Sequence, residues 1–334
     1  MPTSPILSII IVNYNAASVL TACLNSILES KLAFPYEVLV IDNASDESIE
    51  ELTRNFLFAH FIFNTSNNGF ASANNVGISR AMGKYILLLN PDTIVNADSF
   101  KPMIAYMDGH PDVGIVGCKI FNANGQLEHS THSFPSLLKE IVHANEFVKA
   151  FIAYNSRIVK LFKKLFNTKA LESYWDHDAL REVDHVTGAC MMVRKQAIDS
   201  VGLLDEAFFL YNEEVEWSYR MKRAGYKSVF LPDSNIIHLF GYSTKQQVQK
   251  QVVNRLLVER YRGMFYFFQK HYGFAKLFLL RLIVIQGFTL RLLLSYIKKV
   301  SPFRRSPFLS QDIEFLGKIV RLAFATHFDW RGER

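Results

Sequence analysis

Short apolar segments rich in β-branched residues alternate with segments of helical periodicity through the first half of the chain. Strands are predicted at residues 7–12 and 37–41, and helices follow them near residues 17–29 and 48–56. Such alternation predicts the α/β class, with a mostly parallel sheet flanked by helices. Further strands are predicted at residues 61–63, 85–89, 114–118, 183–193 and 228–231.

Composition places this chain among globular proteins. Of its 334 residues, 49% are hydrophobic and 20% are charged, so disorder is not expected. Its cysteines, Cys23, Cys118 and Cys190, lie far apart, and their spacing indicates neither a disulfide framework nor a zinc site. The apolar run at residues 6–12 is too short for a signal sequence and has no basic segment before it. We therefore expect a cytoplasmic catalytic part.

Charge divides the chain near residue 244. Residues 1–244 hold 20 Lys and Arg against 26 Asp and Glu, whereas residues 245–334 hold 17 against 5 and also 11 of the 28 phenylalanines. A basic and aromatic tail favours an anionic membrane surface as its partner. Nucleic acid fits less well, because long Leu, Ile and Phe runs separate the basic residues. We predict a catalytic domain at residues 1–244 and a helical, membrane-associating extension at residues 245–334.

Two segments have a basic amphipathic pattern. For residues 137–167, a surface helix packed on the core and a membrane contact are equally compatible with the pattern. Residues 277–297 are mostly apolar but contain Arg281 and Arg291, each of which would cost about 2.5–3.5 kcal/mol near a bilayer centre. An interfacial helix, peripheral on the inner face of the cell membrane, is therefore favoured over a spanning one. A helix packed on the catalytic domain, with its arginines reaching water, is the alternative.

Polar residues follow the predicted strands of the first half. The strand at residues 85–89 is stopped by Pro91 and followed by Asp92, a placement that suits a metal and a phosphate. Asn13 and Asn15 end the first strand, and Asp42 ends the second, where a carboxylate could accept a hydrogen bond from a nucleobase or a ribose. Turn formation and helix capping are the structural alternatives for these residues.

Later segments supply further candidate site residues. Gly69 opens an asparagine-rich helix start that also holds Asn75 and could bind a diphosphate or a sugar. A glutamate pair, Glu213 and Glu214, opens another helix; a carboxylate there could act as a general base, although it would also complement the helix dipole. The remaining candidates are Gly188, Ala189 and His238.

Taken in order, seven segments resemble glycosyltransferases of family 2 with the GT-A fold, in particular the bacterial rhamnosyltransferase-like branch. They read SIIIVNYNA, VLVIDNASD, NNGFASANNVGI, YILLLNPDT, TGACMMVRK, FFLYNEEVEWSYRMKRAGY and IIHLFGYST. The resemblance covers roughly residues 6–245, and family members carry a comparable helical tail.

The resemblance implies a role for each candidate residue. Donor nucleotide binding would fall to Asn13, Asn15, Asp42, Gly69 and Asn75; Mg²⁺ or Mn²⁺ binding to Asp92 and His238; catalysis to Glu214 as the base with Glu213 beside it; and acceptor binding to Gly188 and Ala189. Two departures from the family pattern stand out. Asn90 replaces one of two metal-motif aspartates, and Glu213–Glu214 replaces the usual Glu-Asp pair.

These roles imply an inverting, metal-dependent transfer of a sugar from a nucleoside diphosphate donor to a hydroxyl of a lipid-linked glycan in cell-envelope polysaccharide synthesis. The donor expected from the resemblance is dTDP-rhamnose. A histidine ligand tilts the metal somewhat toward Mn²⁺. A nucleotide-sugar pyrophosphorylase and a non-catalytic, membrane-bound sugar-nucleotide-binding protein are the alternatives, but residues 13–19 lack the Gly-rich phosphate loop that the first would need.

Overall fold

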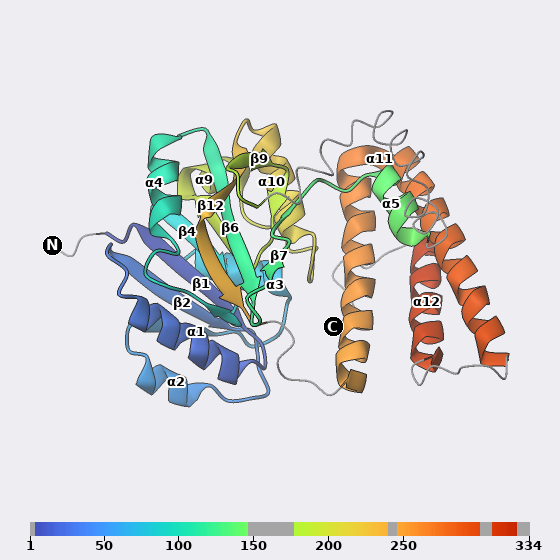
Figure 1. Cartoon of the computed structure of the whole chain (residues 1–334), viewed down its shortest axis with the longest axis horizontal. Coiled ribbons are helices and arrows are strands. Elements are labelled where there is room, and N and C mark those ends of the chain that lie inside the picture. Colours follow the sequence, from blue (N-terminus) through green and yellow to red (C-terminus); the bar gives the residue numbers. More distant parts are fainter. Residues whose placement is uncertain (1–3, 146–176, 240–245, 301–308, 326–334) are drawn as a thin grey trace.

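The computed structural model describes residues 4–145, 177–239, 246–300 and 309–325. An α/β unit carries the central sheet, and a layer of long helices lies beside it (Figure 1). The strands are β1 Leu7–Asn13, β2 Tyr36–Asp42, β3 Ala59–Phe63, β4 Tyr85–Leu89, β5 Thr93–Ile94, β6 Val113–Asn122, β7 Leu127–Glu128, β8 Thr131–His132, β9 Arg181–Val183, β10 His185–Val186, β11 Cys190–Arg194 and β12 Lys227–His238. The helices are α1 Ala17–Ser30, α2 Glu50–Asn55, α3 Phe70–Ile78, α4 Lys101–Gly109, α5 Leu137–Ala144, α9 Lys195–Val201, α10 Glu213–Arg223, α11 Gln246–Val300 and α12 Leu309–Phe324.

The central sheet runs in the order β3-β2-β1-β4-β11-β6-β12-β5. Strands β3, β2, β1 and β4 are parallel, as is the β6–β12 pair, while β11 runs antiparallel to both β4 and β6. The predicted mostly parallel α/β sheet is confirmed. One prediction is wrong: residues 183–193 do not form a single strand but are divided among β9, β10 and β11.

Register brings the ends of the strands together at one edge of the sheet. Asn13 pairs with Asp42 across β1 and β2, and Ile11 of β1 pairs with Leu89 at the end of β4. Strand β12 continues beyond Pro232, where the sequence predicted its end, because a register shift absorbs the interruption. Its last residue, His238, therefore lies opposite Thr93 of β5.

Both faces of the sheet are covered by apolar side chains. One buried cluster joins the sheet to α1, α2 and α4, and a second joins it to α3, α9 and α10. Strand β1 is buried at every position, which explains why its sequence is a continuous apolar run rather than an alternating one. Trp217 of α10 is fully buried, and its indole N–H donates to the Gly202 carbonyl oxygen at 2.9 Å. The core thereby holds the beginning of α10 against the sheet edge.

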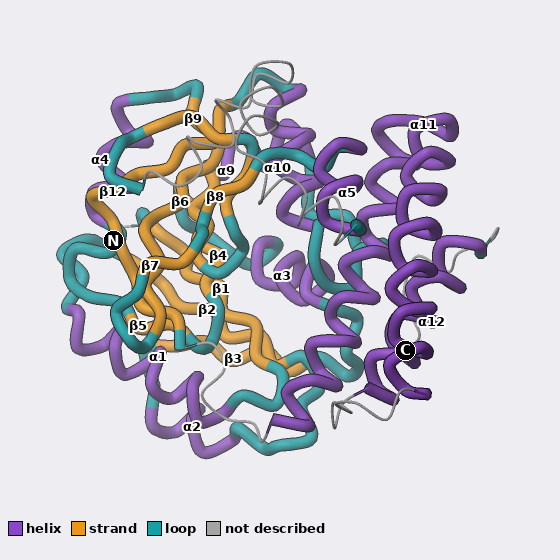
Figure 2. The backbone as a smooth tube through the Cα atoms, turned by 45° about the vertical axis from the view of Figure 1, so that its right-hand side comes forward, coloured by secondary structure: helices purple, strands orange, loops and turns teal. Residues whose placement is uncertain are grey.

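The C-terminal helices share a third core with the α/β unit. Helix α11 breaks at Gly273, where φ is +81°, and its two arms pack with α12 and α5 (Figure 2). This core includes Phe265 and Phe268 of α11 together with Phe208 and Val215 of the catalytic part. The predicted domain boundary at residue 244 and most of the amphipathic stretch at residues 137–167 lie outside the described residues. The extension therefore packs directly on the elements that carry the glutamate pair.

Candidate active site

Asn13 and Asp42 form a buried polar pair at the carboxyl ends of β1 and β2. The Asn13 amide donates to Asp42 Oδ1 at 2.7 Å, and the Ser45 hydroxyl donates to the same oxygen at 2.7 Å. The Asn13 side-chain oxygen is buried and has no hydrogen-bond partner among the described residues. Because an unpaired buried acceptor costs free energy, this oxygen is available to a ligand donor.

Asn15 shapes the loop beside that pair. Its φ is +50°, and its side-chain oxygen accepts from the backbone N–H of Asp46 at 2.8 Å and of Glu47 at 3.3 Å. The backbone N–H of Asn15 donates to the Ser45 hydroxyl at 2.9 Å. Asn15 thus holds the loop after β2 in place, next to Asp42.

Gly69 and Asn75 connect α3 to the segment that precedes α10. Gly69 has φ of +92° and lies so close to the Phe209 carbonyl that a side chain would clash with it. The Asn75 amide donates to the Leu204 carbonyl at 2.9 Å and to Glu206 Oε1 at 3.0 Å, and its oxygen accepts from the Leu204 N–H at 3.1 Å. Asn75 therefore fixes this segment, and a direct contact with the donor sugar stays a prediction.

Asp92 and His238 meet at the sheet edge. His238 Nε2 lies 3.2 Å from Asp92 Oδ1 and 3.4 Å from the Asn90 amide nitrogen. On the other side of the ring, Nδ1 lies 3.2 Å from Glu128 Oε2. Burial lowers the pKa of His238, but its contacts with Asp92 and Glu128 outweigh that effect and raise it.

This arrangement fits a divalent cation. A carboxylate such as Glu128 at Nδ1 is the usual second partner of a metal-binding histidine, because it keeps the proton on that nitrogen. A bound cation would then take the Nε2 lone pair together with the oxygen of Asp92. Among the described residues, no group of three or more His, Cys, Asp or Glu side chains forms a metal cage. Two protein ligands leave several coordination positions for water or donor phosphate, as Mg²⁺ and Mn²⁺ sites commonly do.

The glutamate pair follows a strained turn. Tyr211 and Asn212 have φ of +68° and +70°, a conformation that is uncommon for residues other than glycine. The Asn212 amide donates to the Arg260 carbonyl at 3.0 Å, and a side chain at Gly263 would lie 2.9 Å from that amide nitrogen. Helix α11 therefore holds the turn that presents the start of α10.

Both carboxyls of the pair have an unpaired buried oxygen, Oε2 of Glu213 and Oε2 of Glu214. Burial raises the pKa of Glu214 to about 7, and the backbone N–H groups at the helix start and the charge of Arg260 offset only part of that effect. Burial and the neighbouring Glu214 also raise the pKa of Glu213. A carboxyl with a pKa near neutrality and an unpaired oxygen has the properties of a general base.

Gly188 and Ala189 lie where β11 begins, beside the end of β4. The Ala189 carbonyl accepts from the Asn90 N–H at 3.0 Å, and Gly188 faces the ring of Phe70. They thus border the edge at which Asn90 and Asp92 emerge. Their role in acceptor binding stays a prediction.

Sequence reasoning missed Glu128 and Arg260. Glu128 lies in the short strand β7, which has no recognisable pattern, and only the β6–β7 pairing brings it to His238. Arg260 is one of the basic residues of the tail, and no sequence pattern indicates that α11 contacts the turn at Tyr211 and Asn212.

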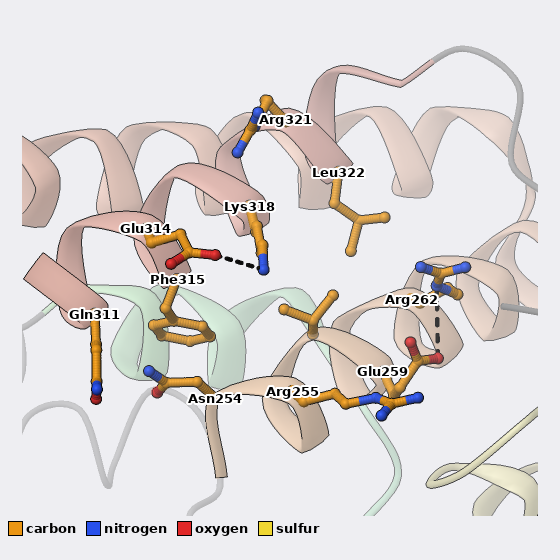
Figure 3. A pocket seen from close by; sticks show the side chains of 11 residues that line it. Asn254, Arg255, Glu259, Arg262, Gln311, Glu314, Phe315, Lys318, Arg321 and Leu322 are labelled. Carbon is orange, nitrogen blue, oxygen red and sulfur yellow. Dashed lines mark ion pairs between the residues drawn. The ribbon is translucent and has the colours of Figure 1, made fainter. Parts of the chain in front are cut away.

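The described residues also line a cavity of about 910 Å³ between the first arm of α11 and α12 (Figure 3). It contains two ion pairs, Arg262 with Glu259 and Lys318 with Glu314. None of the predicted site residues lines it. The candidate active site is therefore the sheet edge and the start of α10, not this cavity.

The α/β fold thus brings the polar strand ends and the buried glutamate pair into one unit. Residues 8–202 match the family model for glycosyl transferase family 2, so the chain belongs to that family and is a glycosyltransferase. This finding confirms the family resemblance and favours the glycosyltransferase interpretation over the two alternatives.

Curated relatives are similar at modest identity. The low-salt glycan biosynthesis hexosyltransferase Agl10 of Haloferax volcanii is 27% identical over 221 residues, which are 65% of this chain and 62% of that protein. The N-acetylglucosaminyl-diphospho-decaprenol L-rhamnosyltransferase of Mycobacterium tuberculosis is 25% identical over 222 residues, 63% of this chain and 68% of that protein. The matched segments thus span about two thirds of each relative.

Solved glycosyltransferases share the fold. The mannosyltransferase PcManGT from Pyrobaculum calidifontis, in complex with GDP-Man and Mn²⁺, matches with a TM-score of 0.53 and 13% identity over 96% of this chain and 87% of that one. GalNAc-T7 with UDP, GalNAc and Mn²⁺ matches with a TM-score of 0.51 and 17% identity over 80% and 50%. These similarities confirm the GT-A fold.

Proposed function

We propose that the protein is an inverting, metal-dependent glycosyltransferase that moves a sugar from a nucleoside diphosphate to a hydroxyl of a lipid-linked glycan in cell-envelope polysaccharide synthesis. Rhamnose from dTDP-rhamnose is the proposed donor. Support comes from the relative named as a rhamnosyltransferase that acts on a diphospho-decaprenol-linked sugar.

The observation that carries this proposal is the environment of Glu214. Its carboxyl has a buried oxygen without a hydrogen-bond partner among the described residues, and its pKa is raised to about 7. In a single displacement, Glu214 accepts the proton of the acceptor hydroxyl while that oxygen attacks the anomeric carbon. The nucleoside diphosphate leaves from the opposite face, so the anomeric configuration inverts. Base catalysis of this kind contributes about 10²- to 10⁴-fold in rate.

The donor would lie along the sheet edge. The open oxygen of Asn13 and the carboxylate of Asp42 suit the imide of a pyrimidine base. Asp92 and His238 would hold Mn²⁺ or Mg²⁺, which when bound neutralises charge on the leaving diphosphate. Gly188 and Ala189 would border the acceptor.

The extension supports a membrane-surface location on the cytoplasmic side. Residues 254–297 lie in a helix long and apolar enough to cross a membrane. Only 28% of its most apolar 18-residue stretch is buried inside the protein, so much of this apolar surface is exposed. Beyond the break at Gly273, the second arm exposes an apolar stripe with helical spacing: Phe274, Phe278, Leu282, Leu293 and Ile297. Two arms joined at a sharp break, with Arg281 beside the stripe, suit a helix lying in the interface.

A donor screen tests the catalytic proposal. Nucleotide sugars, dTDP-rhamnose first, are added to the full-length protein with and without Mn²⁺, and thermal unfolding is followed. We expect a stabilisation that depends on both donor and metal, because each binds only the folded state. Absence of a metal-dependent shift with every donor would overturn the proposal. Asp92→Asn is the matched variant and should lose the Mn²⁺-dependent part of the shift.

Vesicle flotation tests the location. The protein should float with vesicles that contain anionic lipid and much less with purely zwitterionic vesicles, since basic residues near a surface contribute about 1 kcal/mol each. Phe274→Ser and Phe278→Ser together should reduce flotation. Equal flotation of wild type and double variant would exclude this stripe as the contact.

A further inference from the structure

Arg260 of α11 lies beside the turn that precedes the glutamate pair, because its main chain is bonded to Asn212. The side chain is exposed, and within the described residues its guanidinium has neither a hydrogen bond nor a close ion pair. Other arginines at this interface are engaged. Arg220, for example, binds Glu216 and the carbonyls of Val201 and Leu203.

The main chain of Arg260 is held firmly while its side chain is free. Its carbonyl accepts from the Asn212 amide at 3.0 Å, and Gly263, one turn later, packs against the Tyr211 carbonyl. Tyr261 beside it is buried in the third core. The start of the Arg260 side chain is thus fixed relative to the catalytic turn, as a ligand-binding residue requires.

The charge of Arg260 affects the pKa values of groups on α10, α5 and β8 and in the turn before α10. It lowers the pKa of Glu214 on α10, of Glu140 on α5 and of Tyr211 in the turn, in each case against a larger raising effect of burial. It also acts on Lys139 of α5 and on His132 of β8, whose pKa burial lowers to about 4, so that this imidazole is neutral at pH 7. The charges that act most on His238 are instead Asp92 and Glu128.

The remaining charges around Arg260 do not cancel it by contact. Glu140 is 4% exposed, and burial biases it toward its neutral form. The Lys139 ammonium donates to the carbonyls of Ser133 and Phe134. The exposed guanidinium of Arg260 therefore starts from a main chain bonded to the turn before Glu214, and its planar set of donors is unused among the described residues. Such a set matches the oxygens of a phosphate.

We propose that Arg260 binds a phosphate of the acceptor, so that the extension contributes directly to acceptor recognition. This inference rests on the proposed function. The hydroxyl that reacts must approach Glu214, and in a diphosphate-linked sugar the phosphate is attached to the same ring. A cation beside the base, supplied by a helix and not by the metal-binding edge, is placed to bind the acceptor diphosphate while Asp92 and His238 serve the donor.

The test compares two acceptors. One is a sugar linked to a short prenyl diphosphate, and the other is the same sugar as an uncharged alkyl glycoside. Arg260→Gln should lower the ratio of kcat/KM for the charged acceptor to that for the uncharged one on the order of 10- to 100-fold, the range for a hydrogen bond to a charged group. Arg260→Lys should recover part of the ratio.

Arg255→Gln is the matched control. Arg255 is also exposed on α11, but it lines the cavity between α11 and α12, so its loss should leave the ratio unchanged. An unchanged ratio for Arg260→Gln would overturn the inference, and so would a shift of only the acidic limb of its pH–rate profile, which would assign Arg260 to the tuning of Glu214. If wild type transfers no sugar at all, the proposed function fails instead. Calorimetric binding of a short prenyl diphosphate in the absence of donor then still tests Arg260.

Discussion

Two carboxylates in the first turn of α10, Glu214 and Glu216, lie in contrasting environments. Glu214 keeps an unpaired oxygen, and burial raises its pKa to about 7. Glu216, two residues later, is fully buried, and burial alone would raise its pKa as well. It instead accepts hydrogen bonds from His271, Arg220 and Lys270, which together lower its pKa to about 2.

The difference teaches that partners, not burial, separate a reactive carboxylate from a structural one. Glu216 joins α10 to α11 through Lys270 and His271, and Lys270 also binds Asp205 at 2.6 Å. The same helix thus anchors the extension at one point and presents the proposed base at another. Because different side chains have the two roles, single substitutions at Glu214 and Glu216 can separate a loss of chemistry from a loss of stability.

Glu214→Gln should give the largest effect, a fall in kcat of about 10³-fold with donor binding retained, because glutamine keeps the shape but cannot accept the proton. Initial rates and donor affinity measure the two quantities. The matched variant Glu213→Gln should cost far less, about 10-fold, since its carboxyl only influences the charge of its neighbour. A larger loss for Glu213→Gln than for Glu214→Gln would transfer the role of base to Glu213.

Glu216→Gln should act on stability. Removing the carboxylate leaves Lys270, His271 and Arg220 without their shared partner, and breaking a buried ion pair costs about 3 kcal/mol or more. Denaturant unfolding measures the change in the free energy of unfolding. Glu314→Gln is the control, because Glu314 and Lys318 form an exposed pair on α12, and solvent screens such pairs so that they contribute little to stability. Equal effects of the two variants would show that the cluster around Glu216 does not anchor α11.

The strands that position the candidate site could largely be predicted from the sequence. A continuous apolar run bounded by Pro91 gave the strand at residues 85–89 with its observed limits. Asn13 and Asp42 were recognisable because each ends such a run. The segment at residues 183–193 was read wrongly, because the breaks between its three strands depend on which neighbours each pairs with: β9 with β12, β10 with β8, and β11 with β4 and β6.

The ion pairs that distinguish the two glutamates could not be predicted in the same way. Glu216 and Arg220 are spaced i, i+4, so a local pair between them can be read from the sequence, and the structure has it at 2.8 Å. The sequence contains no sign of Lys270 and His271, more than fifty residues away, nor of Glu128 at His238. The strained turn at Tyr211 and Asn212 was hidden as well, since it is stabilised by Gly263 of α11. Contacts between distant segments decide which carboxylate is paired, and local patterns carry no record of them.

The smallest effect distinguishes the two glutamates by the pH dependence of stability. The folded pKa of Glu214, about 7, lies above its ordinary value of 4.5, so its contribution is fully present below pH 4.5 and is lost as the pH rises through 7. Glu214→Gln should therefore gain stability relative to wild type between pH 5 and 8.

The folded pKa of Glu216, about 2, lies below 4.5, so its contribution is present above pH 4.5 and is lost toward pH 2. The deficit of Glu216→Gln should accordingly shrink below pH 4.5. Denaturant unfolding of both variants and wild type at pH 4, 5 and 8 measures these opposite trends, and parallel curves would mean that the two carboxylates do not differ as the structure indicates.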